Sequence, residues 1–286
     1  MQTRQHVAKL AAIAVLVGVA FGAGEIRKEY RFIVGPKASV SVTNQYGPIS
    51  VKPGSPNQVI VTAILHSDKV EIDQSYAGNR VALLSHLLPG SDQDTGRVDY
   101  EVQVPADANV SLHAGTGPLR AERLNGDLSI EGATANVDVR DIDNAHVHVN
   151  TMDGSVNLTN VSNGHVEITS VNGDVNLNRV TGAMVEVNSN GGRIHYDGDF
   201  SGGGQYRLMS NTGDIEAFAP AYASIEVSAR SVHGQVENDF MLEPEHTSFL
   251  QRAGSAFAGT IGKAASSVKL HSFSGKIHLK KRQTNQ

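Results

Sequence analysis

Residues 156–187 read VNLTNVSNGHVEITSVNGDVNLNRVTGAMVEV. Within this stretch, apolar residues stand in pairs that enclose one polar residue, as in Val156-Asn157-Leu158 and Val166-Glu167-Ile168. The pattern returns at Val175-Asn176-Leu177 and Val185-Glu186-Val187. Alternation of buried and exposed positions over three residues is typical of a short β-strand with one buried face. The stretch therefore predicts four short strands joined by tight corners.

The same pattern runs from about residue 126 to the end of the chain. Between Leu128 and Ile194 the pairs advance by 9 and 10 residues in turn, so two strands make a period of about 19 residues. A unit this short cannot bury its own apolar pair, but stacked units can. The sequence thus predicts an all-β protein, a parallel β-solenoid with a coil of two short strands. The further pairs are Leu128 with Ile130, Val137 with Val139, Val147 with Val149, Ile194 with Tyr196, Tyr206 with Leu208, Ile215 with Ala217, Ile225 with Val227, Val268 with Leu270, and Ile277 with Leu279.

Glycine-containing turns precede many of these strands. Examples are Asn172-Gly173-Asp174 before Val175 and Thr212-Gly213-Asp214 before Ile215. Gly and Asn tolerate a positive φ, at which a β-branched residue is strained. We therefore expect the corners at these turns to use positive φ angles.

The chain divides into four parts by its patterns. Residues 1–24 have a positively charged start, an apolar run and small residues, which predicts a secretory signal peptide, with an uncleaved anchor as the alternative. Residues 25–110 read as a looser set of strands, which we expect to cap the stack. Residues 111–281 form the repeat, with an insertion at about 238–266 that holds Phe240 and Phe249 and reads as a loop or short helix. Residues 282–286 remain as a tail.

Composition excludes some classes of function. Charged residues make up 19% of the chain and the net charge is -5, so the basic surface of a nucleic-acid-binding protein is missing. There is no Cys, so an exported form must be held together by packing and backbone pairing alone. After signal removal we expect no membrane span.

The order of the motifs resembles a known family. The chain has an export signal, then VSVTNQYGPISV at 40–51, VDYEVQVPA at 98–106, serial turns such as VNGDV at 171–175, and FSGKIHL at 273–279. This order is similar to that of the bacterial "putative adhesin" family, domain of unknown function 4097, over about residues 28–281. The resemblance implies a β-solenoid exposed to the envelope or cell surface, without catalytic residues to carry over.

Three clusters are candidates for chemistry. Asp138, Asp141 and Asp143 could belong to a carbohydrate-active site, but single outward carboxylates are typical of a solvated face. Asp127, Asp174 and Asp214 follow turn glycines, as in calcium-binding repeats, but those repeats keep a strict period of nine residues and this chain alternates nine with ten. Hard cations also need six to eight oxygens, which single Asp residues at corners do not supply. His146 and His148, with His165 on the next coil, are the remaining metal candidates. We expect no metal, no cofactor and no catalytic residue.

The outward polar residues are the remaining candidate surface. We expect a non-catalytic exported protein in the periplasm, on the cell surface or secreted, acting as an adhesin-like structural or binding module. Its expected partners are envelope polysaccharide or another surface protein, with no nucleic acid. The alternatives are a carbohydrate-active β-helix enzyme and an envelope-stress or regulatory protein acting through a protein partner; ligand and oligomeric state stay open. The candidate binding face comprises His148, Asn157, Glu167, Asn176, Glu186, His195, Arg207 and Glu216.

Overall fold

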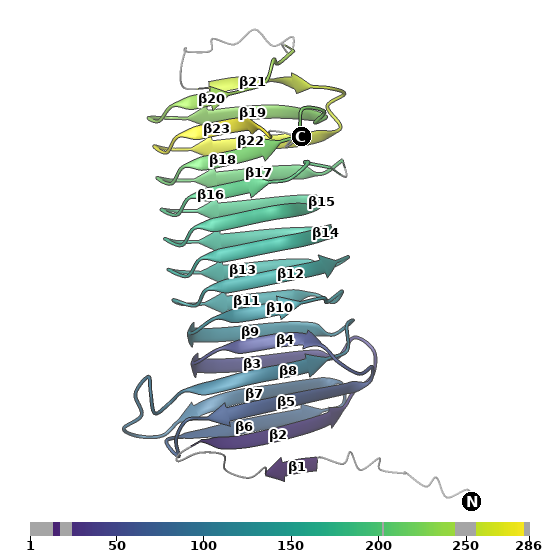
Figure 1. The fold of residues 1–286 in the computed structure, drawn as a ribbon, viewed down its shortest axis with the longest axis vertical. Helices are drawn as coiled ribbons and strands as arrows, with labels where there is room; N and C mark the ends of the chain where they lie inside the picture. The colour runs from purple at the N-terminus through teal and green to yellow at the C-terminus, as the bar shows by residue number, and fades with distance from the viewer. Residues whose placement is uncertain (1–13, 18–24, 202, 244–255, 283–286) are drawn as a thin grey trace, which may run out of the picture.

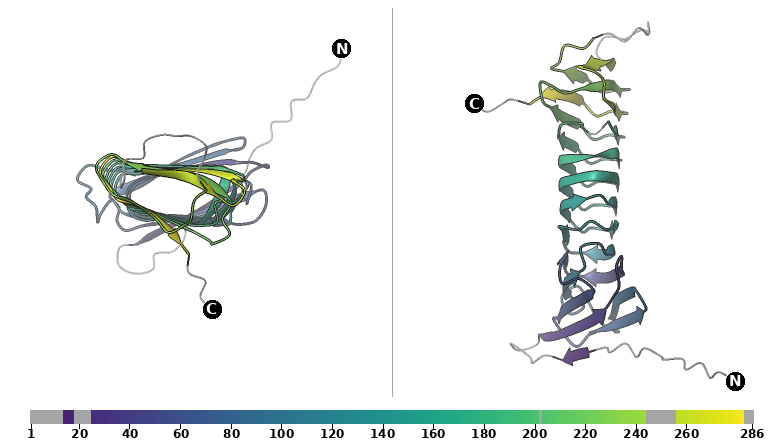
Figure 2. Two further views of the ribbon diagram at one scale, coloured as in Figure 1. Left: turned by 90° about the horizontal axis from the view of Figure 1, so that it is seen from above. Right: turned by 90° about the vertical axis from the view of Figure 1, so that its right-hand side faces the viewer.

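A computed structural model describes residues 14–17, 25–201, 203–243 and 256–282. Within these ranges the regular elements are all β-strands, and they join in one continuous sheet of 23 strands. The strands form a tall stack around a single apolar core (Figure 1). Seen from its end, the stack is a flattened ring with two long sides (Figure 2). We call these sides face A and face B.

Successive strands in the middle of the chain alternate between the two faces. A face A strand and the face B strand that follows it make one rung. Strands on each face pair in parallel with those of the next rung, so that Val156 pairs with Val175 and Val175 pairs with Ile194. The middle strands of face A are β9 (Asn109–Thr116), β11 (Leu128–Gly132), β13 (His146–Thr151), the second halves of β14 (Val156–Ser170) and β15 (Val175–Ser189), and β17 (Gln205–Ser210). Those of face B are β10 (Leu119–Glu122), β12 (Val137–Asp143), the first halves of β14 and β15, β16 (Ile194–Asp197) and β18 (Ile215–Ala219).

The core lies between the faces and is built from the predicted apolar pairs. Every member of those pairs is buried, and the polar residue between them points outward. Each buried aliphatic side chain contributes roughly 1.5–3 kcal/mol of transfer free energy, which the entropy of ordering the chain largely offsets. Aromatic residues replace aliphatic ones at one level, where the rings of Tyr196 and Phe200 stack at 4.2 Å and Tyr206 meets Phe200 edge-on at 5.0 Å.

At the N-terminal end, the first rung in the sequence lies between two later rungs. It consists of β3 (Ser39–Tyr46) and β4 (Ile49–Pro53). On one side it pairs in parallel with β7 (Arg80–Leu87) and β8 (Val98–Val104), and on the other with β9 and β10. Antiparallel strands close this end: β6 (Val70–Ala77) on β7, β5 (Gln58–Leu65) on β8, β2 (Ile26–Ile33) on β5, and β1 (Ala14–Val17) on β2.

The C-terminal end repeats this arrangement. The last rung, β22 (Ser266–Ser272) with β23 (Ile277–Lys281), lies between β17–β18 and the rung of β19 (Ile225–Ser231) and β20 (Val236–Asn238). Figure 1 shows the yellow β22 and β23 enclosed by green strands that precede them in the chain. In both end regions, strand neighbours in space are therefore not neighbours in sequence.

The predicted insertion at about 238–266 differs in part from the structure. Its second half forms β21 (Ala256–Ile261), a strand that pairs antiparallel with β19, where a loop or short helix was expected. Phe240 and Phe257 pack partly buried against the core, whereas Met241 is 98% exposed. Phe249 lies outside the described residues.

The prediction that the corner glycines adopt positive φ is wrong, and glycine is required there for a different reason. Gly154, Gly173, Gly192 and Gly213 do not adopt positive φ. They stack on one another, so that a Cβ on Gly173 would lie 2.0 Å from the carbonyl oxygen of Gly154. Glycine is needed there because the rungs approach too closely for a side chain. At the equivalent corner, positive φ occurs at Gly47 and Gly117, in the rungs of β3–β4 and β9–β10. It also occurs at the opposite corner, at Arg123, Asp141, Asn144, Asn160, Asn163 and Arg179.

The predicted signal segment lies outside the described residues apart from β1. Among the residues that the structure describes, none forms a helix long and apolar enough to cross a membrane.

Candidate binding surfaces

The residues of the predicted binding face lie on two opposite faces. The reason is that each short repeat unit spans only half a rung, so consecutive outward residues alternate between the long sides of the ring. Each face then brings every second candidate together in one ladder. Face A holds His148, Glu167, Glu186 and Arg207, and face B holds Asn157, Asn176, His195 and Glu216.

On face A the charged groups pair with neighbours on adjacent rungs. Nδ1 of His148 lies 3.5 Å from Oε2 of Glu167. The guanidinium of Arg207 donates to Oε2 of Glu186 at 2.9 Å, and Asn188 donates to the other oxygen of the same carboxylate at 3.2 Å. This ladder therefore presents partly neutralised charge to solvent.

On face B an amide ladder passes into an ion-pair cluster. Asn176 donates from Nδ2 to Oδ1 of Asn157 at 2.9 Å. Glu216 accepts a hydrogen bond from Nζ of Lys280 at 2.7 Å and lies 3.8 Å from Nδ1 of His195. The hydrogen bond and charge of Lys280 hold the pKa of Glu216 below its usual value.

The candidate catalytic carboxylates do not converge. Both oxygens of Asp138 accept from Arg140 at 2.8 Å. Asp143 accepts from Ser162 at 2.7 Å and Asn163 at 2.8 Å, and these hydrogen bonds lower its pKa. Each of these carboxylates is thus engaged with its own near neighbours.

The aspartates that follow turn glycines connect adjacent rungs. The carboxylates of Asp127, Asp174 and Asp214 accept a backbone N–H from the corner of the next rung, at 3.0, 2.9 and 2.7 Å. Their place in the sequence therefore has a structural explanation.

The histidine cluster is only partly assembled. The rings of His146 and His165 stack at 4.8 Å, while His148 faces Glu167. Within the described ranges, three or more His, Cys, Asp or Glu side chains nowhere gather in a geometry that could hold a metal ion.

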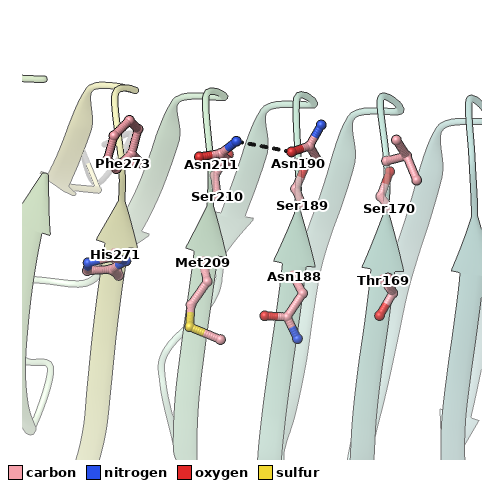
Figure 3. Close-up of a pocket in the computed structure, with 11 residues that line it drawn as sticks. Thr169, Ser170, Asn188, Ser189, Asn190, Met209, Ser210, Asn211, His271 and Phe273 are labelled. Atoms are coloured by element: carbon pink, nitrogen blue, oxygen red, sulfur yellow. Dashed lines mark hydrogen bonds between the residues drawn. The ribbon is translucent and has the colours of Figure 1, made fainter. Parts of the chain in front are cut away.

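A groove that the sequence did not indicate runs across four rungs of face A. It lies where β14, β15, β17 and β22 end and their corners begin (Figure 3), and its volume is about 450 Å³. One side is formed by the last outward residue of each strand: Thr169, Asn188, Met209 and His271. The other side is formed by the first corner residues Val171, Asn190, Asn211 and Phe273.

Buried serines form the floor of this groove and fix its corners. Ser170 and Ser189 donate from Oγ to the carbonyl oxygens of Gly173 and Gly192 at 2.8 and 2.9 Å. Ser210 accepts the N–H of Gly213 at 2.9 Å. A Ser or Thr three residues before each corner glycine is the sequence signal for this floor, and it recurs at Thr151, Ser231 and Ser272.

Comparison with known proteins gives a family match and several remote structural matches. The family model described as Toastrack DUF4097 matches residues 37–280. No curated protein gives a match. A "putative cell adhesion protein" from Clostridium sporogenes is 14% identical, with 90% of this chain and 100% of that chain covered and a TM-score of 0.29. A "putative adhesin" from Bacteroides fragilis is 11% identical, with 92% and 100% covered and a TM-score of 0.39. Another from Parabacteroides merdae is 12% identical, with 89% and 96% covered and a TM-score of 0.39. At these scores we draw no functional inference from the three structures.

Proposed function

The chain belongs to the Toastrack DUF4097 family, and we propose that it is a non-catalytic, exported protein of the cell envelope that acts by surface contact, as an adhesin-like binding module. The observation that carries the proposal is the repetition of outward side chains at one spacing along both faces of the stack. Parallel neighbours on adjacent rungs are about 4.8 Å apart. A surface of this kind matches a partner that is itself extended and repetitive.

We also propose the architecture that underlies this surface. The parallel pairing of strands one full repeat apart, on two faces around one core, supports a parallel β-solenoid with a coil of two short strands. The antiparallel strands β2, β5 and β6 would act as its N-terminal cap, because an unpaired strand edge at the end of a stack invites association.

The geometry favours a binding protein over the alternative, a carbohydrate-active enzyme. A glycosidase needs two carboxyl groups on either side of the sugar, one of them with a raised pKa. The described residues that line the groove of Figure 3 include neither Asp nor Glu. Hydrogen bonds or ion pairs lower the pKa of Asp92, Asp143, Asp174, Glu216 and Glu237, the opposite direction from that of a general acid.

Export is the part of the proposal that rests on sequence. Residues 1–24 have the pattern of a secretory leader. A stack stabilised by backbone pairing and aliphatic packing, without Cys, would fold in the same way in oxidising and reducing compartments.

Co-sedimentation tests the proposal. The purified protein is mixed with insoluble cell envelope at several concentrations, and the pelleted fraction is measured. We expect saturable pelleting that decreases when the charged residues of the face A ladder, Glu167, Glu186 and Arg207, are reversed in charge. Absence of saturable pelleting would refute the proposed envelope contact. Pelleting that survives protease treatment of the envelope would identify polysaccharide as the partner, and pelleting that is lost would identify a surface protein.

A further inference from the structure

The groove across β14, β15, β17 and β22 combines features that are absent from the charged ladders beside it. The described residues that line it include one histidine but no Asp, Glu, Lys or Arg. Above the buried serines of the floor, three asparagines, one threonine and the histidine supply its polar groups, and Val171, Met209 and Phe273 supply apolar surface. Phe273 is 48% exposed, so a large part of its ring is free to contact a ligand.

The polar groups of the groove form a ladder along the stack rather than a single cluster. Asn211 donates from Nδ2 to Oδ1 of Asn190, its neighbour on the preceding rung, at 3.1 Å (Figure 3). A side-chain amide carries two donor hydrogens and an acceptor oxygen, so each asparagine keeps capacity for a ligand after one such bond. Amides that both donate and accept suit hydroxyl groups, which do the same.

The backbone beneath the groove cannot recognise a peptide by strand addition. β15 pairs with β14 and β17, β17 pairs with β15 and β22, and β22 pairs with β17 and β19. Strand addition requires a free row of backbone N–H and C=O groups. A ligand on this surface is therefore held by side chains alone, through hydrogen bonds and apolar contact.

The spacing of the rungs selects the shape of the ligand. Four rungs place the outermost corner residues about 14 Å apart, at about 4.8 Å per rung. An extended chain of β-linked pyranose units has apolar C–H faces as well as hydroxyl edges, and its units repeat on a scale comparable with the rung spacing of about 4.8 Å. From the neutral lining, the amide ladder and this spacing, we propose that the groove binds a neutral, extended β-linked polysaccharide lying along the stack. The inference names the ligand class of the proposed envelope contact and rests on it.

Phe273 and His271 complete this site from a distant part of the chain. They belong to the last rung, which packs against β17 through the pairing of Met209 with His271. Phe273 is oriented by His233 on the following rung, whose ring it meets edge-on at 4.8 Å. We expect the C–H face of one sugar unit to pack on Phe273 while Asn190 and Asn211 contact the hydroxyls of the next units.

The test compares neutral and anionic glycans on matched variants of the full chain. Isothermal titration uses cellohexaose and laminarihexaose as neutral probes and a galacturonate hexamer as the anionic one. The variants are Asn190→Ala and Phe273→Ala in the groove. Asn178→Ala is the control, because it removes the same chemical group from an outward position on the opposite face that belongs neither to the groove nor to the candidate binding face. Thermal unfolding midpoints establish that all three variants fold.

We expect at least one neutral hexamer to bind and the anionic hexamer to bind more weakly. Asn190→Ala and Phe273→Ala should each weaken binding about five- to tenfold, corresponding to the loss of one good contact, while Asn178→Ala leaves it unchanged. Equal loss in the control, stronger binding of the anionic probe, or no neutral binding would overturn the inference. The two proposals fail separately: envelope pelleting without binding of a neutral hexamer refutes only the groove, whereas wild-type protein that does not pellet refutes the envelope contact.

Discussion

Substituting Gly192 by Ala tests whether close stacking of the rungs is what requires glycine at the corners. A Cβ at this position would lie 2.0 Å from the carbonyl oxygen of Gly173 and 2.5 Å from its carbon. The two corners must separate by at least about 1 Å before the contact reaches even 3.0 Å. The neighbouring inter-rung bonds, from Gly191 N to Val171 O at 2.7 Å and from Val175 N to Arg193 O at 2.8 Å, would then be stretched or lost.

The magnitude follows from these two effects. Overpacking a tight site costs typically about 1–3 kcal/mol, and each lost backbone bond costs about 0.5–1.5 kcal/mol. Because local relaxation makes the two terms overlap, we expect Gly192→Ala to lower the free energy of unfolding by about 2–3 kcal/mol. For a chain of this size that corresponds to a decrease in Tm of roughly 5–10 °C. Urea and thermal unfolding followed by circular dichroism measure both quantities.

The adjacent residue supplies the control. A Cβ on Gly191 would meet its nearest atom, Oδ1 of Asn172, at 3.4 Å, an ordinary contact. Gly191→Ala should therefore change stability by less than about 1 kcal/mol, and reduced freedom of the unfolded chain favours a small gain. If the two variants lost equal stability, or if Gly192→Ala were neutral, the stacking explanation would be refuted.

Three other outcomes are expected from other parts of the stack. Tyr196→Phe removes a buried hydroxyl that donates to a backbone carbonyl at 3.0 Å, and it should cost about 1–2 kcal/mol in urea unfolding; an unchanged midpoint would contradict this. Because folding lowers the pKa of Glu216, its ion pair stabilises the fold fully only above the unfolded-chain pKa of about 4.3, and this contribution is lost as the pH falls toward the folded value. Lys280→Met should raise that pKa in a carboxyl NMR titration, and no upward movement would show that Lys280 is not its cause. Deleting residues 266–286 should expose the edges of β17 and β18 and increase aggregation and protease cleavage. Deleting residues 283–286 alone should not. If the two shortened chains aggregated and were cleaved equally, the β22–β23 rung would not be what protects these edges.

The sequence was informative about which residues point inward. Alternation around one polar residue identifies the buried pairs because a strand has a side-chain period of two. The repeat period also predicts the strand partners in the middle of the chain, such as Val156 with Val175. These features depend on local geometry that every repeat shares.

The order of rungs at the two ends could not be predicted in the same way. Ser210 lies beside Ser272 rather than beside a residue of the next repeat in sequence. Neighbouring repeats have similar inward residues, so apolar periodicity does not distinguish one stacking order from another. The groove could not be predicted for the same reason, because Asn211 and Phe273 become neighbours only when β22 stacks on β17.

The division of the candidate surface into two faces could have been anticipated. Half a repeat period carries the chain from one long side of the ring to the other, so His148 and Asn157 must lie apart. The engagement of turn aspartates with the next corner, by contrast, depends on atomic distances between rungs that no local pattern encodes.

The equal register of the middle rungs has a consequence for how proteins of this architecture can vary in length. Val156, Val175 and Ile194 occupy equivalent places on successive rungs, each presenting the same edge to the next. A whole repeat unit could be gained or lost between β11 and β16 without altering the contacts that close either end. The length of the stack could thus be adjusted in steps of about 4.8 Å, while the terminal regions, whose strands are interleaved out of sequence order, would have to be retained intact.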